Sequence, residues 1–121
     1  MIRRIEDFDR AFSNQRRGTL KVLAAVTDES LGQQVAPGYR SLGRIAWHLV
    51  DSLADMGNRC GLGIETVDWD NVPATAKQIS DGYERLSGQL LAAVKDKWDD
   101  AALELEDDLY GEMWKRGITL A

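Results

Sequence analysis

The sequence predicts an all-α fold in which amphipathic helices form an antiparallel bundle. Apolar residues recur at helical spacing in three long segments, and no segment shows sustained alternation of apolar and polar residues bounded by hairpin turns. Stretches that contain glycine and proline separate the segments, as expected for loops. With 121 residues, of which 44% are hydrophobic, the chain is long enough for one domain, which we assign to residues 1–121.

The first helix is predicted over about residues 4–28. The polar run SNQRR and Gly18 interrupt its apolar positions, which nevertheless fall near one face: Ile5, Phe8, Phe12, Leu20, Leu23 and Val26. The following stretch, DESLGQQVAPGYR, contains Gly32, Pro37 and Gly38, so it is predicted to be a loop.

The second helix is predicted from about Ser41 to Cys60. Its apolar residues form one stripe that we expect to face the core: Leu42, Ile45, Leu49, Leu53 and Met56. The stretch GLGIETVDWDNVPA follows, and its two glycines and one proline are expected to end this helix and connect it to the next.

The third helix begins at a predicted capping box, in which Thr75 and Gln78 would satisfy free amides of the first turn. Its buried stripe is expected to contain Ile79, Tyr83, Leu86, Leu90, Val94 and Trp98. The remaining residues, DDAALELEDDLYGEMWKRGITLA, predict an acidic connector, a glycine and the opening of a fourth helix. These elements predict an antiparallel four-helix bundle whose fourth helix is incomplete.

A bundle that lacks part of one wall is expected to expose its core. Side chains such as Leu49, Leu53, Leu86 or Leu90 would then face water in a groove. Because covering such apolar surface is favourable, we expect the chain to form a homodimer.

Charge and cysteine content exclude several classes of function. The net charge of −5 would repel a nucleic acid backbone, so no nucleic acid partner is expected. No run of residues approaches the roughly 20 apolar residues of a membrane span, and no signal peptide pattern is present at the start. Cys60 is the only cysteine, which is typical of a protein in a reducing compartment, so a cytoplasmic location is expected.

His48 is the only histidine of the chain. Its helical position places it at the boundary between core and surface, close to Ser52 and Asp55, either of which could orient the ring. That position suits a metal ligand at a cavity, and it is also an ordinary place for a histidine without a function, which spacing alone favours. A catalytic zinc or nickel needs about three protein ligands, and Cys60 lies about 18 Å further along the helix axis. The residues alone leave both interpretations open.

Other catalytic and binding motifs are absent from the sequence. No G-x-S-x-G is present, and neither glycine-rich phosphate-binding pattern occurs, so no catalytic residue and no cofactor-binding residue are assigned. The four tryptophans could line a ligand pocket, or they could act as core or interface side chains, which is the more common role in a small bundle: Trp47, Trp69, Trp98 and Trp114.

Two segments resemble a known family. SLGRIAWHLVDSLADM resembles the second helix of DinB-like (DNA-damage-inducible) helical bundles, and LYGEMWKRGITLA is similar to the segment that leads into their last long helix. The order of helices, loops and acidic connector agrees over essentially the whole chain. These bundles are commonly dimeric and hold a divalent metal with three histidines, of which one comes from the second helix and two from an H-x-x-x-H-R-G-Q-like run in the last.

The resemblance implies that His48 is the first ligand of a zinc or nickel ion. It also implies a metal-dependent transferase or hydrolase, because some relatives use the metal to activate a low-molecular-weight thiol. The sequence departs from the family after ITLA, before the run that would supply the other two histidines. We therefore expect either a truncated form or a degenerate member, inactive by itself and without tightly bound metal. The alternative is a non-catalytic helical protein that acts through dimerisation.

Overall fold

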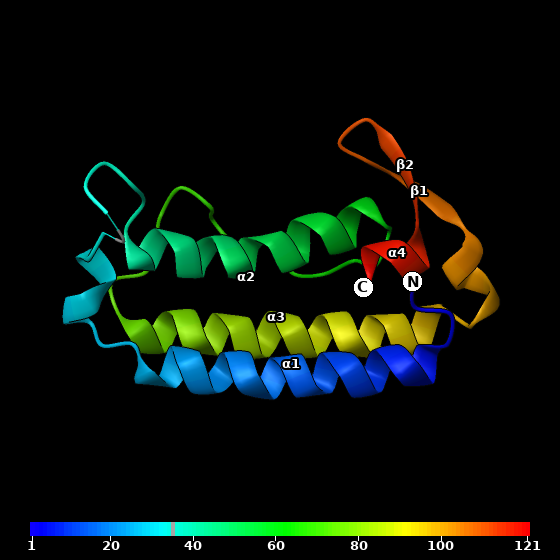
Figure 1. Ribbon diagram of the computed structural model, residues 1–121, viewed down its shortest axis with the longest axis horizontal. Coiled ribbons are helices and arrows are strands. Elements are labelled where there is room, and N and C mark those ends of the chain that lie inside the picture. Colours follow the sequence, from blue (N-terminus) through cyan, green and yellow to red (C-terminus); the bar gives the residue numbers. More distant parts are fainter. Residues whose placement is uncertain (35) are drawn as a thin grey trace.

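The computed structural model describes residues 1–34 and 36–121 and contains three long helices (Figure 1). These are α1 (Ile5–Ala25), α2 (Leu42–Arg59) and α3 (Ala76–Lys97), so each of the three helices predicted from the sequence is present. A short 3₁₀ helix, η1 (Glu29–Gly32), follows α1. Val35, which belongs to the predicted loop between the first two helices, lies outside the described residues.

α3 lies between α1 and α2, and both outer helices pack against it (Figure 1). All six apolar residues predicted for its buried stripe are buried: Ile79, Tyr83, Leu86, Leu90, Val94 and Trp98. The predicted capping box is present, since Thr75 and Gln78 bond reciprocally at the start of the helix. The Asp28 carboxylate accepts a further hydrogen bond of 2.8 Å from the Ala76 amide, so backbone amides at the start of α3 that have no partner within the helix are hydrogen-bonded.

α1 is held against α3 by apolar and polar contacts. Phe8 and Leu23 are buried in the core. Arg16 donates to the Ser87 hydroxyl at 2.7 Å and to the Glu84 carbonyl at 2.8 Å, which satisfies the fully buried hydroxyl. The Asp100 carboxylate accepts a bond of 2.7 Å from the Ile5 amide.

The buried face of α2 differs from the one predicted. The buried face of α2 contains mainly small residues around one tryptophan, with Gly43 against Leu31 and Val72 rather than against α3: Gly43, Ala46, Trp47, Val50, Ala54 and Gly57. The predicted stripe lies on another side of the helix, where Ile45 is 42% and Leu49 is 39% exposed. The prediction was wrong because α2 has two apolar faces, and the small residues allow its backbone to approach α3 closely.

The C-terminal part also differs from the prediction, because a β-hairpin precedes a very short helix. After η2 (Ala101–Glu104), β1 (Glu106–Leu109) pairs with β2 (Glu112–Lys115) in antiparallel register, and α4 (Arg116–Thr119) follows. Tyr110 and Gly111 form the turn with φ angles of 58° and 92°. Positive φ at both turn residues is typical of a tight hairpin. The fold is therefore mostly helical with a small two-stranded sheet, rather than all-α.

The hairpin and α4 are tied to each other and to the N-terminus. Asp107 and Arg116 form a largely buried ion pair of 2.8 Å, and the Arg116 guanidinium lies over the Trp98 ring at 4.5 Å. The Ile2 amide donates to the Gly117 carbonyl at 2.8 Å. Across the described ranges, no helix is long and apolar enough to cross a membrane.

Candidate functional site

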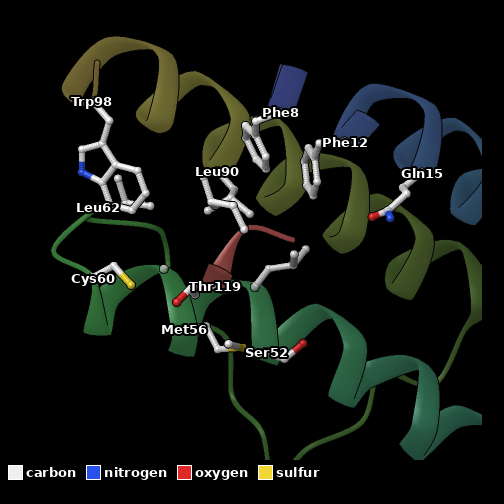
Figure 2. Close-up of a pocket in the computed structure, with 13 residues that line it drawn as sticks. Phe8, Phe12, Gln15, Ser52, Met56, Cys60, Leu62, Leu90, Trp98 and Thr119 are labelled. Carbon is white, nitrogen blue, oxygen red and sulfur yellow. The ribbon is translucent and has the colours of Figure 1, made fainter. Parts of the chain in front are cut away.

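An apolar groove is lined by residues of α1 and α2, and Leu90 of α3 also lines it. Its cavity has a volume of about 160 Å³. Figure 2 shows Phe8 and Phe12 projecting from α1 on one side, and Ser52 and Met56 of α2 on the other. Thr119, near the C-terminal end of the described chain, also lines the groove. The three long helices therefore leave an open apolar surface beside the end of α4.

The face of α2 that borders the groove is the stripe that was expected in the core. Leu53 and Met56 line the groove and are half-buried, while Ile45 and Leu49 continue the stripe toward the start of the helix and are more exposed. The sequence predicted a groove of this kind. Of the leucines named for it, Leu53 and Leu90 line the cavity, although Leu90 is largely buried, whereas Leu86 is fully buried in α3.

His48 is exposed on α2 beside this stripe. At 3.6 residues per turn, it lies about 60° around the helix from Ile45 and one turn before Ser52, which lines the groove. On its other side the imidazole contacts the Trp69 indole, with ring centroids 5.2 Å apart and planes at 72°. His48 therefore stands between the groove and the loop that connects α2 to α3.

The two partners expected for His48 are engaged elsewhere. The Ser52 hydroxyl donates to the Leu49 carbonyl at 2.8 Å. The Asp55 carboxylate accepts a hydrogen bond from the Tyr110 hydroxyl and pairs with Arg59 at 3.4 Å. These contacts, of which the bond from Tyr110 is the stronger cause, lower the pKa of Asp55. The expectation that Ser52 or Asp55 orients the ring is therefore not met.

Asp51 is the acidic residue of α2 on which His48 acts electrostatically. Partial burial and then repulsion from Asp55 raise the pKa of Asp51, while the neighbouring His48 acts in the opposite direction. The helix thus presents the His48 imidazole and the Asp51 carboxylate one turn apart. His48 is exposed and Asp51 is half-buried. This pair supplies only one nitrogen ligand for a metal.

The loop from residue 61 to residue 75 brings Trp69 to His48. Arg44 fixes this tryptophan twice, because its guanidinium lies over the indole at 4.4 Å and also donates to the Trp69 carbonyl. The Trp47 indole nitrogen donates to the Asp68 carbonyl at 2.8 Å. The loop is therefore bound to α2 on both sides of Trp69.

The four tryptophans have different environments. Trp47 and Trp98 are buried core residues, in agreement with the interpretation of these side chains as core elements. Trp98 also lines the groove. Trp114 is 41% exposed on the hairpin, and Trp69 is half-buried against Arg44 and His48. No periodicity or motif in the sequence predicts the contact of Trp69 with His48, since it joins a helix to an irregular loop.

The residues present do not complete a metal centre. Within residues 1–34 and 36–121, no group of three or more histidine, cysteine, aspartate or glutamate residues is close enough to hold a metal ion. Cys60 is buried near Asp107, and burial followed by the influence of that carboxylate raises its pKa to about 11. A neutral buried thiol is a poor metal ligand. His48 remains a single accessible nitrogen donor.

A family model and a solved structure of a similar protein indicate the same family. The family model described as the DinB family matches residues 1–119. YrdA of Bacillus subtilis (strain 168), itself an uncharacterised protein, is 30% identical over 121 residues, which is 99% of this chain and 72% of YrdA. A crystal structure of a DinB-like protein from Bacillus cereus ATCC 10987 superposes with a TM-score of 0.94 at 35% identity, over 99% of this chain and 81% of that one. The chain therefore belongs to the DinB family.

Proposed function

We propose that this chain is the His48-bearing part of a metal-dependent transferase or hydrolase that acts on a low-molecular-weight thiol. The observation that carries the proposal is the position of His48, the only histidine, exposed beside an open apolar groove. An imidazole one turn from Ser52, which lines the groove, can meet ligands from a segment that covers the groove and extends toward the start of α2.

The covering segment in this proposal is a fourth amphipathic helix in a longer form of the protein. Thr119 and Leu120 already line the groove, so a chain that continues from α4 starts beside it. Both relatives contain residues that have no counterpart here, because the match covers only part of each of them. Such a helix would bury the stripe of Ile45 and Leu49 and complete a four-helix bundle.

Two further nitrogen ligands from that helix, together with His48, would suit zinc or nickel. Three protein ligands and one open position are the usual set for a catalytic zinc. When bound, the ion would act as a Lewis acid that lowers the pKa of a thiol or of water. The groove side chains, mostly apolar, would exclude water from the reacting group.

A cobalt experiment tests the proposed function. An extended form that continues past Ala121 to the length of the relatives is loaded with Co²⁺ in place of the native ion, and free cysteine is added as the thiol probe. We expect a thiolate-to-cobalt absorption band in the near ultraviolet that is missing from His48→Gln. If cysteine leaves the spectrum of the cobalt-loaded protein unchanged, thiol activation is excluded as the role of the site.

The groove also favours a second candidate, a non-catalytic protein that acts through dimerisation. In that case the stripe of Ile45 and Leu49 would pack on a second copy, and His48 would have no role in metal binding. The two candidates differ in one property. Removal of the His48 imidazole abolishes metal binding by an extended form if the first holds, and it changes neither metal content nor dimer stability if the second holds.

A further inference from the structure

We propose that Trp69 is a positioning residue for His48, so that the loop between α2 and α3 sets the orientation of the imidazole. The indole and imidazole centroids are 5.2 Å apart and the ring planes meet at 72°, an edge-to-face arrangement that aromatic rings prefer. This inference rests on the proposed function for its purpose, but the contact itself belongs to the metal-free chain.

Trp69 is suited to this role because its own position is fixed. Arg44 lies over the indole at 4.4 Å and donates to the Trp69 carbonyl, and its second terminal nitrogen donates to the Asp70 carbonyl at 3.2 Å. The bond from Trp47 to the Asp68 carbonyl holds the preceding residue. Two side chains of α2 therefore fix the loop on the same helix that carries His48.

The contact replaces a polar partner that a ligand histidine usually has. A metal-ligating imidazole is commonly oriented by a carboxylate or carbonyl behind it. Here Ser52 and Asp55 bond to Leu49 and to Tyr110 and Arg59, and within the described residues no hydrogen bond joins His48 to Asp51, the carboxylate one turn away. An indole that packs against the imidazole at this distance restricts the rotation of His48.

Proton nuclear magnetic resonance of the full 121-residue chain tests the proposal directly. Because His48 is the only histidine, its ring protons are assigned without ambiguity. We expect nuclear Overhauser cross-peaks between these protons and one indole, a ring-current displacement of their resonances from the free-imidazole position, and Hα–Hβ couplings of His48 that correspond to one rotamer.

Three variants separate positioning from a merely structural role. Trp69→Leu should lose the cross-peaks, return the resonances toward the free-imidazole position and average the couplings of His48. Trp69→Phe keeps an aromatic ring and should restore most of the displacement and the single rotamer. Trp114→Leu removes an indole from the hairpin, near the opposite end of α2 (Figure 1), and should change none of these signals.

Absence of the cross-peaks in the unmodified protein would overturn the proposal, whether or not any variant folds. A Trp69→Leu protein that folds and keeps His48 in one rotamer would overturn it as well. Neither measurement uses a metal. If the proposed function is wrong, the cross-peaks and the His48 couplings should still be observed. If the contact with Trp69 is absent, metal binding by an extended form is still tested separately.

Discussion

Ile2 and Gly117 are held together by a backbone hydrogen bond of 2.8 Å, and a Cβ atom added at Gly117 would overlap the Ile2 carbonyl oxygen. The N-terminal residues therefore lie directly across the start of α4. The contact lies just before Thr119 and Leu120, which line the groove.

Replacement of Gly117 should weaken the fold. Gly117→Ala is expected to lower the free energy of unfolding by about 1–3 kcal/mol, since the added methyl group displaces backbone rather than a flexible side chain. Gly18→Ala is the control, because it lies inside α1 with nothing within 4 Å. That change should raise the free energy of unfolding by about 0.5–1 kcal/mol. Urea denaturation measures both, and equal effects would mean that the N-terminus does not pack on Gly117.

Neighbouring residues of α2 should respond very differently to a negative charge. Val50 is fully buried against α3, so Val50→Asp is expected to cost ~3 kcal/mol or more, or to prevent folding. Leu49 is 39% exposed, so at protein concentrations where the chain is a monomer Leu49→Asp should cost less than about 1 kcal/mol. Thermal unfolding followed by circular dichroism distinguishes the two variants. A greater loss at Leu49 would show that the originally predicted helical face is the buried one.

The apolar groove should make the chain associate. Ile45 is 42% and Leu49 is 39% exposed, so covering the remaining surface of each side chain is worth about 0.6–1.2 kcal/mol, the matching share of the value for complete burial. Light scattering at low micromolar concentration is expected to give twice the 13.5 kDa mass of one chain. Leu49→Asp should return the mass to that of a monomer while the helical signal is retained. A monomeric wild-type chain without exposed-surface dye binding would contradict this expectation.

Alkaline pH should destabilise the protein through Cys60. Burial raises the pKa of this thiol from its ordinary value of 9.0 to about 11, so the unfolded chain loses the proton at lower pH than the folded one. The stability associated with the neutral thiol is complete below pH 9 and is lost as pH rises toward 11. The urea midpoint should therefore fall more between pH 8 and pH 10.5 in the wild type than in Cys60→Ala. Parallel pH dependence of the two proteins would exclude this cause.

The sequence allowed the three long helices to be predicted, and it also allowed the buried face of α3 to be predicted. Apolar spacing and the capping box of Thr75 and Gln78 gave the extent and buried side of α3, because a single stripe leaves one choice. α2 carries two apolar stripes, and helical spacing cannot decide which of them packs on α3. Small residues such as Ala46 and Ala54 were the available signal, since they permit close approach of two helices.

The hairpin and the contact of Trp69 with His48 were missed for different reasons. β1 consists of Glu106, Asp107, Asp108 and Leu109, residues with little intrinsic preference for strands, and only Gly111 indicated a tight turn. The Trp69 contact depends on the path of an irregular loop, which no periodicity describes. The ligand role of His48 was proposed from resemblance, and the structure contributes its exposure beside the groove.

The metal content of an extended form, measured after extensive dialysis, tests the central claim most directly. If His48 is a ligand completed by a helix in the groove, the extended form should retain about one zinc or nickel ion per chain, as expected for a three-ligand site. The 121-residue chain, with its single accessible nitrogen donor, and the extended His48→Gln protein should each retain far less. Retention of a full equivalent by the extended His48→Gln protein would contradict the account, and so would an extended wild-type form that holds none.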